Sequence, residues 1–116
     1  MNMLTLVVAS MLSMAAMKAD PMDDARKAFN NCMIVAHNKA IDDKTPPNSF
    51  TKIADEACIP ERGAYRDILI KSERSYGSNQ KDAEKFANEE VQMIVDSLVT
   101  SFNENVENGA KLTIEK

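Results

Sequence analysis

The 116-residue sequence has no tryptophan, one histidine and three glycines, and these shortages exclude several classes of protein. Three glycines cannot supply the glycine-rich loop that holds phosphate, and no Walker, dinucleotide-binding or zinc-protease motif occurs. The single histidine, His37, leaves no second imidazole for a histidine-based metal site. The sequence therefore predicts no cofactor, no metal and no catalytic motif.

Positive charge is also scarce. The chain has 14 lysines and arginines against 18 aspartates and glutamates, so its net charge is −4. Binding to nucleic acid depends on lysine and arginine side chains that neutralise phosphates. A polybasic contact with anionic lipid needs the same excess of cations. We therefore expect no nucleic-acid partner and no polybasic contact with a membrane surface.

A long apolar run occurs only at the start of the chain. It begins at Leu4 and meets no charge until Lys18. A short apolar segment followed by small residues is typical of a cleavable export signal, here residues 1–19, with cleavage after Ala19 or Ala15. The alternative is an ordinary buried helix. An exported chain would be periplasmic or secreted, without a stable membrane anchor after cleavage, since the run is shorter than the ~20 residues of a bilayer span.

The remaining residues predict one all-α domain, residues 20–110, built as a small bundle of about four helices. Capping residues, prolines and glycines divide it: Asp20-Pro21 starts a helix, Pro46-Pro47 and Pro60 interrupt, and Gly77 ends one. Apolar residues recur at helical spacing in each segment. The expected helices span about 21–42, 49–58, 61–76 and 80–108, and residues 111–116 are expected to form a flexible tail.

Two cysteines lie on the apolar sides of the first two expected helices. In an exported chain, Cys32 and Cys58 are expected to form a structural disulfide. A closed loop of this length would stabilise the fold by roughly 3.5 kcal/mol on the chain-entropy model. Free or redox-active thiols are the alternative, which the wide spacing disfavours because a Cys-x-x-Cys arrangement is missing.

Other polar residues offer weaker candidates for chemistry. His37 is expected at the surface or half-buried. The acidic pairs Asp42-Asp43 and Glu89-Glu90 could act as acid–base groups or bind a cation, but a solvated helical face is the favoured interpretation. Arg62, Tyr65 and Arg66 form the best candidate for a partner-binding patch, since arginine and tyrosine are favoured at protein interfaces. Its alternative is a plain face of mixed charge.

The layout resembles small exported bacterial helical proteins without an assigned activity. The shared elements are Phe29-Asn30-Asn31-Cys32, Ala57-Cys58 and a long acidic last helix. In addition, Cys58-Ile59-Pro60-Glu61 resembles the Cys-Ile-Pro that precedes a helix in exported immunity proteins against cell-wall amidase toxins. The glycine-rich first helix and the final Phe-Pro-Cys of that family are missing here.

Three functions remain open on the sequence alone. The first is a non-enzymatic protein of the cell envelope that binds another protein, as an inhibitor, an immunity protein or a chaperone. The second is a carrier of a small apolar ligand, in a cavity lined by Phe29, Tyr65, Phe86 and Phe102; filling of the core by these aromatics is the favoured alternative. An enzyme is the third, and it rests only on the carboxylate pairs.

Overall fold

The structure, a computed structural model, describes residues 20–116; the predicted signal at residues 1–19 lies outside the described residues. The described chain forms four α-helices and no strand, which confirms the all-α prediction. A single 3₁₀ turn, η1 (Pro47–Ser49), precedes the second helix. The helices are α1 (Pro21–Asp42), α2 (Phe50–Glu56), α3 (Ile59–Ser75) and α4 (Gln80–Asn105).

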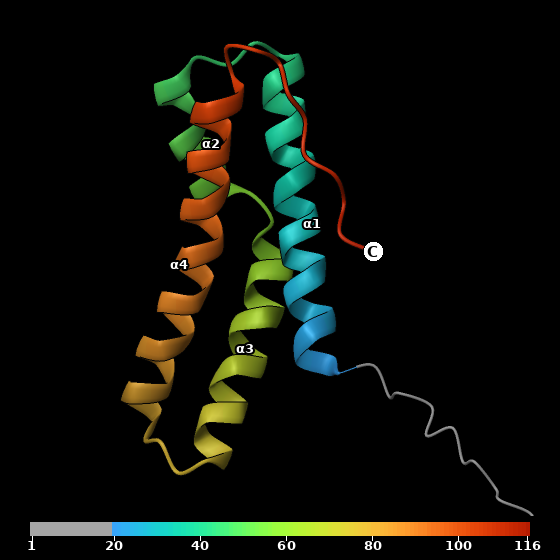
Figure 1. Cartoon of the computed structure of the whole chain (residues 1–116). Coiled ribbons are helices and arrows are strands. Elements are labelled where there is room, and N and C mark those ends of the chain that lie inside the picture. The colour runs from blue at the N-terminus through green and yellow to red at the C-terminus, as the bar shows by residue number, and fades with distance from the viewer. Residues whose placement is uncertain (1–19) are drawn as a thin grey trace, which may run out of the picture.

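Three rods make up the bundle (Figure 1). The first is α1 and the third is α4, and both ascend in the same direction. Between them α3 runs the opposite way, and it packs against both neighbours. The short α2 lies behind the upper part of α4 in this view, and it contacts α1 and α4. The chain passes from α2 into α3 through residues 57 and 58.

The ends of the helices follow the local signals in the sequence. The Asp20 side chain accepts a hydrogen bond from the Met22 amide at 3.0 Å, and Asn79 accepts one from the Asp82 amide at 2.9 Å. Gly77 follows α3 with a φ of 101°, a left-handed conformation that costs glycine little. These two caps and this stop confirm the expected start of the first helix and the expected boundary between the third and fourth helices.

Aromatic side chains fill the upper half of the core. Phe50 of α2 stacks on Phe102 of α4 with ring centroids 4.4 Å apart, and both rings are completely buried. Phe29 of α1 is also fully buried and lies 6.3 Å from the ring of Tyr65. Apolar residues of all four helices therefore share one core.

His37 is not at the surface as expected, because it is completely buried. Its ring meets Phe50 and Phe102 edge-on, with centroids 6.2 and 5.9 Å away. Its Nδ1 lies 2.8 Å from the Asn38 Oδ1, and its Nε2 lies 3.4 Å from the Asn105 Nδ2. Burial of the imidazole is tolerable because both ring nitrogens have polar neighbours.

The expected flexible tail at residues 111–116 has no regular secondary structure, but it is not loose. It runs back along α1 (Figure 1), and Lys111 pairs with Asp42 at 2.7 Å. Farther along, the Glu115 carboxylate accepts hydrogen bonds from the Arg26 guanidinium at 2.6 and 3.0 Å. This guanidinium lowers the pKa of Glu115 below its ordinary value. Helical periodicity could not predict these contacts, since they join residues 69 and 89 positions apart.

Phe102 and Phe86 lie on the same helix and offer a matched test of the core. We expect Phe102→Ala to lower the free energy of unfolding by about 3–5 kcal/mol, because the fully buried ring leaves a cavity. Phe86 is 36% exposed, so Phe86→Ala should lower the free energy of unfolding by less than half as much. Chemical denaturation followed by circular dichroism measures both values; equal losses would contradict this description of the core.

Candidate functional site

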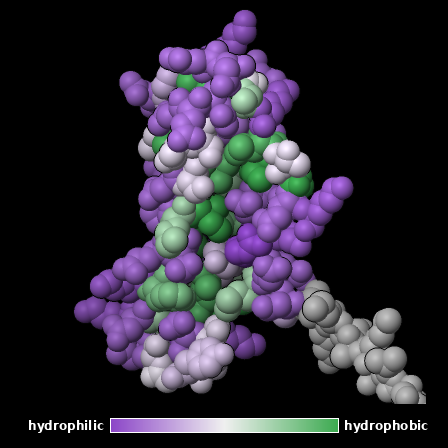
Figure 2. All heavy atoms as spheres, in the orientation of Figure 1, coloured by the Kyte–Doolittle hydropathy of each residue, from purple (hydrophilic) through white to green (hydrophobic). Residues whose placement is uncertain are grey.

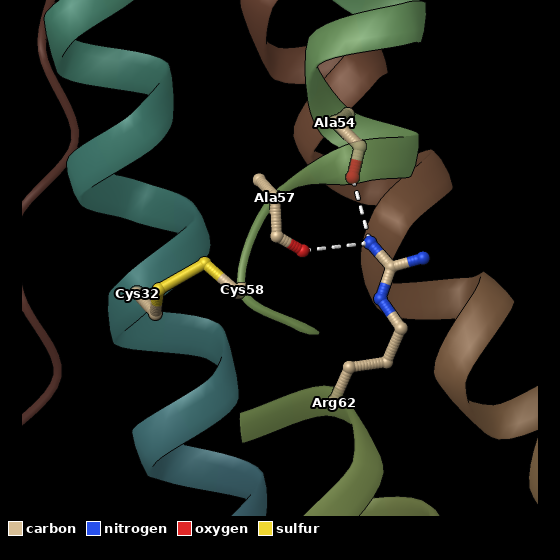
Figure 3. The surroundings of a disulfide bond; sticks show 5 residues. All are labelled: Cys32, Ala54, Ala57, Cys58 and Arg62. Carbon is tan, nitrogen blue, oxygen red and sulfur yellow. Dashed lines mark hydrogen bonds between the residues drawn. A yellow bond between two sulfur atoms is a disulfide. The ribbon is translucent and has the colours of Figure 1, made fainter. Parts of the chain in front are cut away.

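Cys32 and Cys58 form the disulfide that their positions predict. The sulfur atoms lie 2.07 Å apart and the two Cα atoms 6.0 Å apart. The bond joins the middle of α1 to the break between α2 and α3 (Figure 3). It closes a loop across a sequence separation of 26 residues, and it ties the shortest helix to the first rod.

The break between α2 and α3 uses an unusual backbone conformation. Cys58 has a φ of 59° and a ψ of 38°, which is the left-handed region. A residue with a Cβ pays roughly 1–2 kcal/mol there, and glycine is the usual choice. The conformation lets the chain turn between Glu56 and Ile59 in only two residues. The disulfide holds this same residue in place.

Arg62 closes the break from the other side. Its Nη2 donates hydrogen bonds to the carbonyl oxygens of Ala54 and Ala57, at 2.7 and 3.1 Å (Figure 3). These carbonyls belong to the last turn of α2, which has no partners of its own for them. The guanidinium also lies 5.6 Å from the centre of the Phe29 ring. Arg62 is thus a clamp between α2, α3 and α1.

The structure does not assemble the predicted patch of Arg62, Tyr65 and Arg66 at the surface. Tyr65 is only 4% exposed, and its burial raises the pKa of its hydroxyl. Arg62 points inward to the carbonyls of α2. Arg66 is partly accessible, as Arg62 is, and it donates a hydrogen bond to the Asn88 side chain at 2.8 Å. Arg62 therefore has a structural role as a clamp, and Tyr65 is a residue of the core.

The groups that could support chemistry are dispersed over the described residues. Cys32, Cys58 and Glu61 bring their ligand atoms within 4.8 Å of one another, but both sulfurs are used in the disulfide. Asp42 pairs with Lys111 and Asp43 with Lys39. In contrast, an accessible apolar cluster occurs on one side of α4.

Phe86, Met93 and Ile94 make up this cluster, which we call the α4 apolar face. Phe86 and Met93 are seven residues apart, so two helical turns place them on the same side of α4. They are 36% and 64% exposed, whereas Ile94, the residue after Met93, is half-buried and packs against the core at the edge of this face. Figure 2 shows a separate apolar band in the middle of the view, between the α4 and α1 rods, with hydrophilic atoms on both sides. Clustered apolar side chains at a surface are typical of an interaction site.

Met93, Asn31 and Asn38 are residues that helical periodicity does not single out. Met93 lies outside the apolar stripe that predicts the core. The two asparagines carry a detectable signal, since they lie seven residues apart inside a helix where asparagine is a poor helix former. Such residues often bond to a backbone with their side chains. Here that backbone belongs to the C-terminal segment.

Comparison with protein-family models, with curated proteins and with solved structures finds no match to this chain. None of the helices between residues 20 and 116 combines the length and the hydropathy needed to cross a bilayer.

Replacing both cysteines tests the contribution of the disulfide. We expect the Cys32→Ser/Cys58→Ser variant to lose about 3.5 kcal/mol of unfolding free energy, the value that the chain-entropy model gives for a loop of this length. The measurement is urea denaturation of the variant and of the oxidised protein. Reduced wild-type protein is the control and should lose a similar amount; an unchanged midpoint in both would show that the bond adds no stability.

Arg62 and Arg66 provide a second matched comparison, one turn apart on α3. Arg62→Met should lower the unfolding free energy by about 2 kcal/mol, because two carbonyls of α2 lose a charged donor. Arg66→Met should cost about 0.5 kcal/mol, as a surface substitution. Thermal and urea denaturation measure both losses. Equal stability of the two variants would remove Arg62 from its role as a clamp.

Proposed function

We propose that this chain is an exported, non-enzymatic protein of the periplasm or the extracellular space that acts by binding another protein. The contact surface in this proposal is the α4 apolar face, Phe86, Met93 and Ile94. The observation that carries it is the exposure of Phe86 and Met93 on the same side of a helix. Arg66 remains an accessible neighbour, whereas Tyr65 and Arg62 have structural positions.

Export is supported by two independent features. The first is the apolar run with small residues at residues 1–19, which matches a cleavable signal. The second is the disulfide between Cys32 and Cys58, a bond that persists in oxidising compartments and is rare in the cytosol. Together they support a location in the periplasm or the extracellular space.

Binding of a protein is supported by the energetics of the α4 apolar face. Full burial of a phenylalanine or methionine side chain is worth about 1.5–3 kcal/mol. In the isolated chain Met93, 64% exposed, gains only the smaller part of that energy, and Phe86, 36% exposed, does not gain all of it. A partner that covers Phe86, Met93 and Ile94 would recover it. Such a contact needs no catalytic group on this chain.

Among binding functions, an inhibitor or immunity protein is favoured over a carrier of a small apolar ligand. The carrier would need a cavity lined by Phe29, Tyr65, Phe86 and Phe102. In the structure Phe102 instead stacks on Phe50 at 4.4 Å, and Phe86 lies at the surface. The aromatics thus fill the core. The resemblance of Cys58-Ile59-Pro60-Glu61 to exported immunity proteins supports the inhibitor version.

The test is affinity purification of the tagged chain from the envelope fraction of its source cells, with wild-type and variant proteins in parallel. We expect one protein partner in stoichiometric amount with the wild type and at least a tenfold lower yield with Met93→Asp, since burial of an uncompensated carboxylate costs several kcal/mol. Mass spectrometry identifies and quantifies what is retained.

Val35→Asp is the matched control. Val35 is 58% exposed and lies on α1, outside the α4 apolar face. This variant should retain the partner as well as the wild type does. Circular dichroism of both variants verifies the fold. Equal retention by Met93→Asp and the wild type would reject the α4 apolar face as the contact surface.

A further inference from the structure

The C-terminal segment is bound to α1 as an extended peptide is bound to a receptor. Asn38 donates from Nδ2 to the Leu112 carbonyl, and the Leu112 amide donates back to the Asn38 Oδ1, both at 2.9 Å. Asn31 repeats this pair on Glu115, with both distances 2.8 Å. Each asparagine side chain therefore satisfies both backbone groups of one residue.

The spacing of the two pairs matches the geometry of the two chains. Asn31 and Asn38 are seven residues apart, which is about 10.5 Å along an α-helix. Leu112 and Glu115 are three residues apart, which is about 9–10 Å in an extended or polyproline-type chain. In polyproline II every third residue has the same orientation. Any extended chain of that pitch fits the two asparagines, because they read backbone atoms alone.

Side-chain contacts add a pattern to this backbone recognition. Leu112 packs against the hydrophobic core. The Glu115 carboxylate takes two hydrogen bonds from Arg26 and one from Asn30 at 3.2 Å. The two residues between them, Thr113 and Ile114, are exposed. The surface thus selects an apolar residue followed three positions later by an acidic one.

We propose that Arg26, Asn30, Asn31 and Asn38, which we call the asparagine strip, form a binding site for an extended segment of a partner protein with the pattern Leu-x-x-Glu. Residues 111–116 occupy this site in the same chain and must be displaced. The proposal goes beyond the function proposed above, since the α4 apolar face plays no part in it.

Displacement is feasible because both ion pairs that hold the segment, Arg26–Glu115 and Asp42–Lys111, are open to solvent. The Arg26–Glu115 pair is about one-third exposed on each side, so solvent screens it. A covalently attached ligand nevertheless competes at a local concentration in the millimolar range. An external peptide therefore binds weakly until the segment of the same chain is released. This competition makes the occupancy of the site measurable.

The experiment uses full-length variants and two fluorescent peptides. One peptide has the sequence of residues 109–116, and the other has lysine in place of the glutamate. Glu115→Lys and Arg26→Glu each place like charges at the strip, so both release the segment. We expect Glu115→Lys to bind the glutamate peptide at least about tenfold more tightly than the wild type does, by fluorescence polarisation. Arg26→Glu should prefer the lysine peptide by a similar factor.

The double variant Arg26→Glu/Glu115→Lys is the main control. It restores opposite charges within the chain, so the segment should reoccupy the strip and both peptides should again bind weakly. Equal affinity of both single variants for both peptides would overturn the proposal. Binding by the double variant as tight as that of the single variants would overturn it too.

Asn31 tests the backbone recognition separately. Asn31→Ala in the Glu115→Lys chain should weaken binding of the glutamate peptide about tenfold. Asn103 is an exposed asparagine of α4, so Asn103→Ala in the same chain should leave that binding unchanged. Met93→Asp should also leave peptide binding unchanged, which separates this site from the α4 apolar face. Undiminished binding after Asn31→Ala would reject recognition by the asparagine strip. Circular dichroism verifies that each variant is folded.

Discussion

The disulfide at Cys58 is the constraint on which the rest of this bundle depends. A seven-residue helix such as α2 is far too short to be stable alone, because nucleation costs more than a few turns return. Yet α2 contributes Phe50, which stacks on Phe102 and touches the ring of His37. The bond to Cys32 and the hydrogen bonds of Arg62 hold α2 in place. Through Phe50, the centre of the core depends on the same two contacts.

This constraint also explains how a left-handed residue with a side chain is tolerated. A glycine at residue 58 would relieve the backbone but could not bond to α1. Cys58 has an unfavourable φ of 59°, but its side chain forms a covalent link to α1 at the point where the chain passes from α2 into α3. The link and the break occur in one residue, so α2 has little freedom to move relative to α1. Local strain here is offset by the tertiary bond.

Features of the fold that depend on neighbouring residues could be predicted from the sequence. Asp20 and Asn79 cap their helices, and Gly77 ends α3, because these signals act within one turn. Features that depend on distant residues could not. Arg62 is exposed on an isolated helix, and only the fold of α2 brings two free carbonyls to it. His37 is polar, and only Asn38 and Asn105 make its burial acceptable.

The candidate sites are among the features that depend on distant residues and that the sequence could not predict. Periodicity assigns Phe86 to the core, but the helix turns it to the surface next to Met93. The asparagine strip is visible in the sequence only as two residues of low helix propensity at a spacing of seven. Its meaning depends on a segment more than 70 residues away. The positions of the two asparagines in the sequence do not reveal which backbone segment their side chains bind.

Asn38 shows why the asparagine strip favours exchange of one peptide for another over an empty state. Its Oδ1 accepts from the Leu112 amide and faces the Nδ1 of buried His37, so the Leu112 bonds fix the orientation of this amide. The same orientation makes Nδ1 of His37 the donor. Loss of the C-terminal segment without replacement would leave a half-buried amide free to turn beside the core, at a cost. An incoming extended chain presents the same amide and carbonyl, because these groups are common to every residue except proline. It restores both bonds, so His37 and the aromatic stack around it keep their arrangement while the occupant of the strip changes.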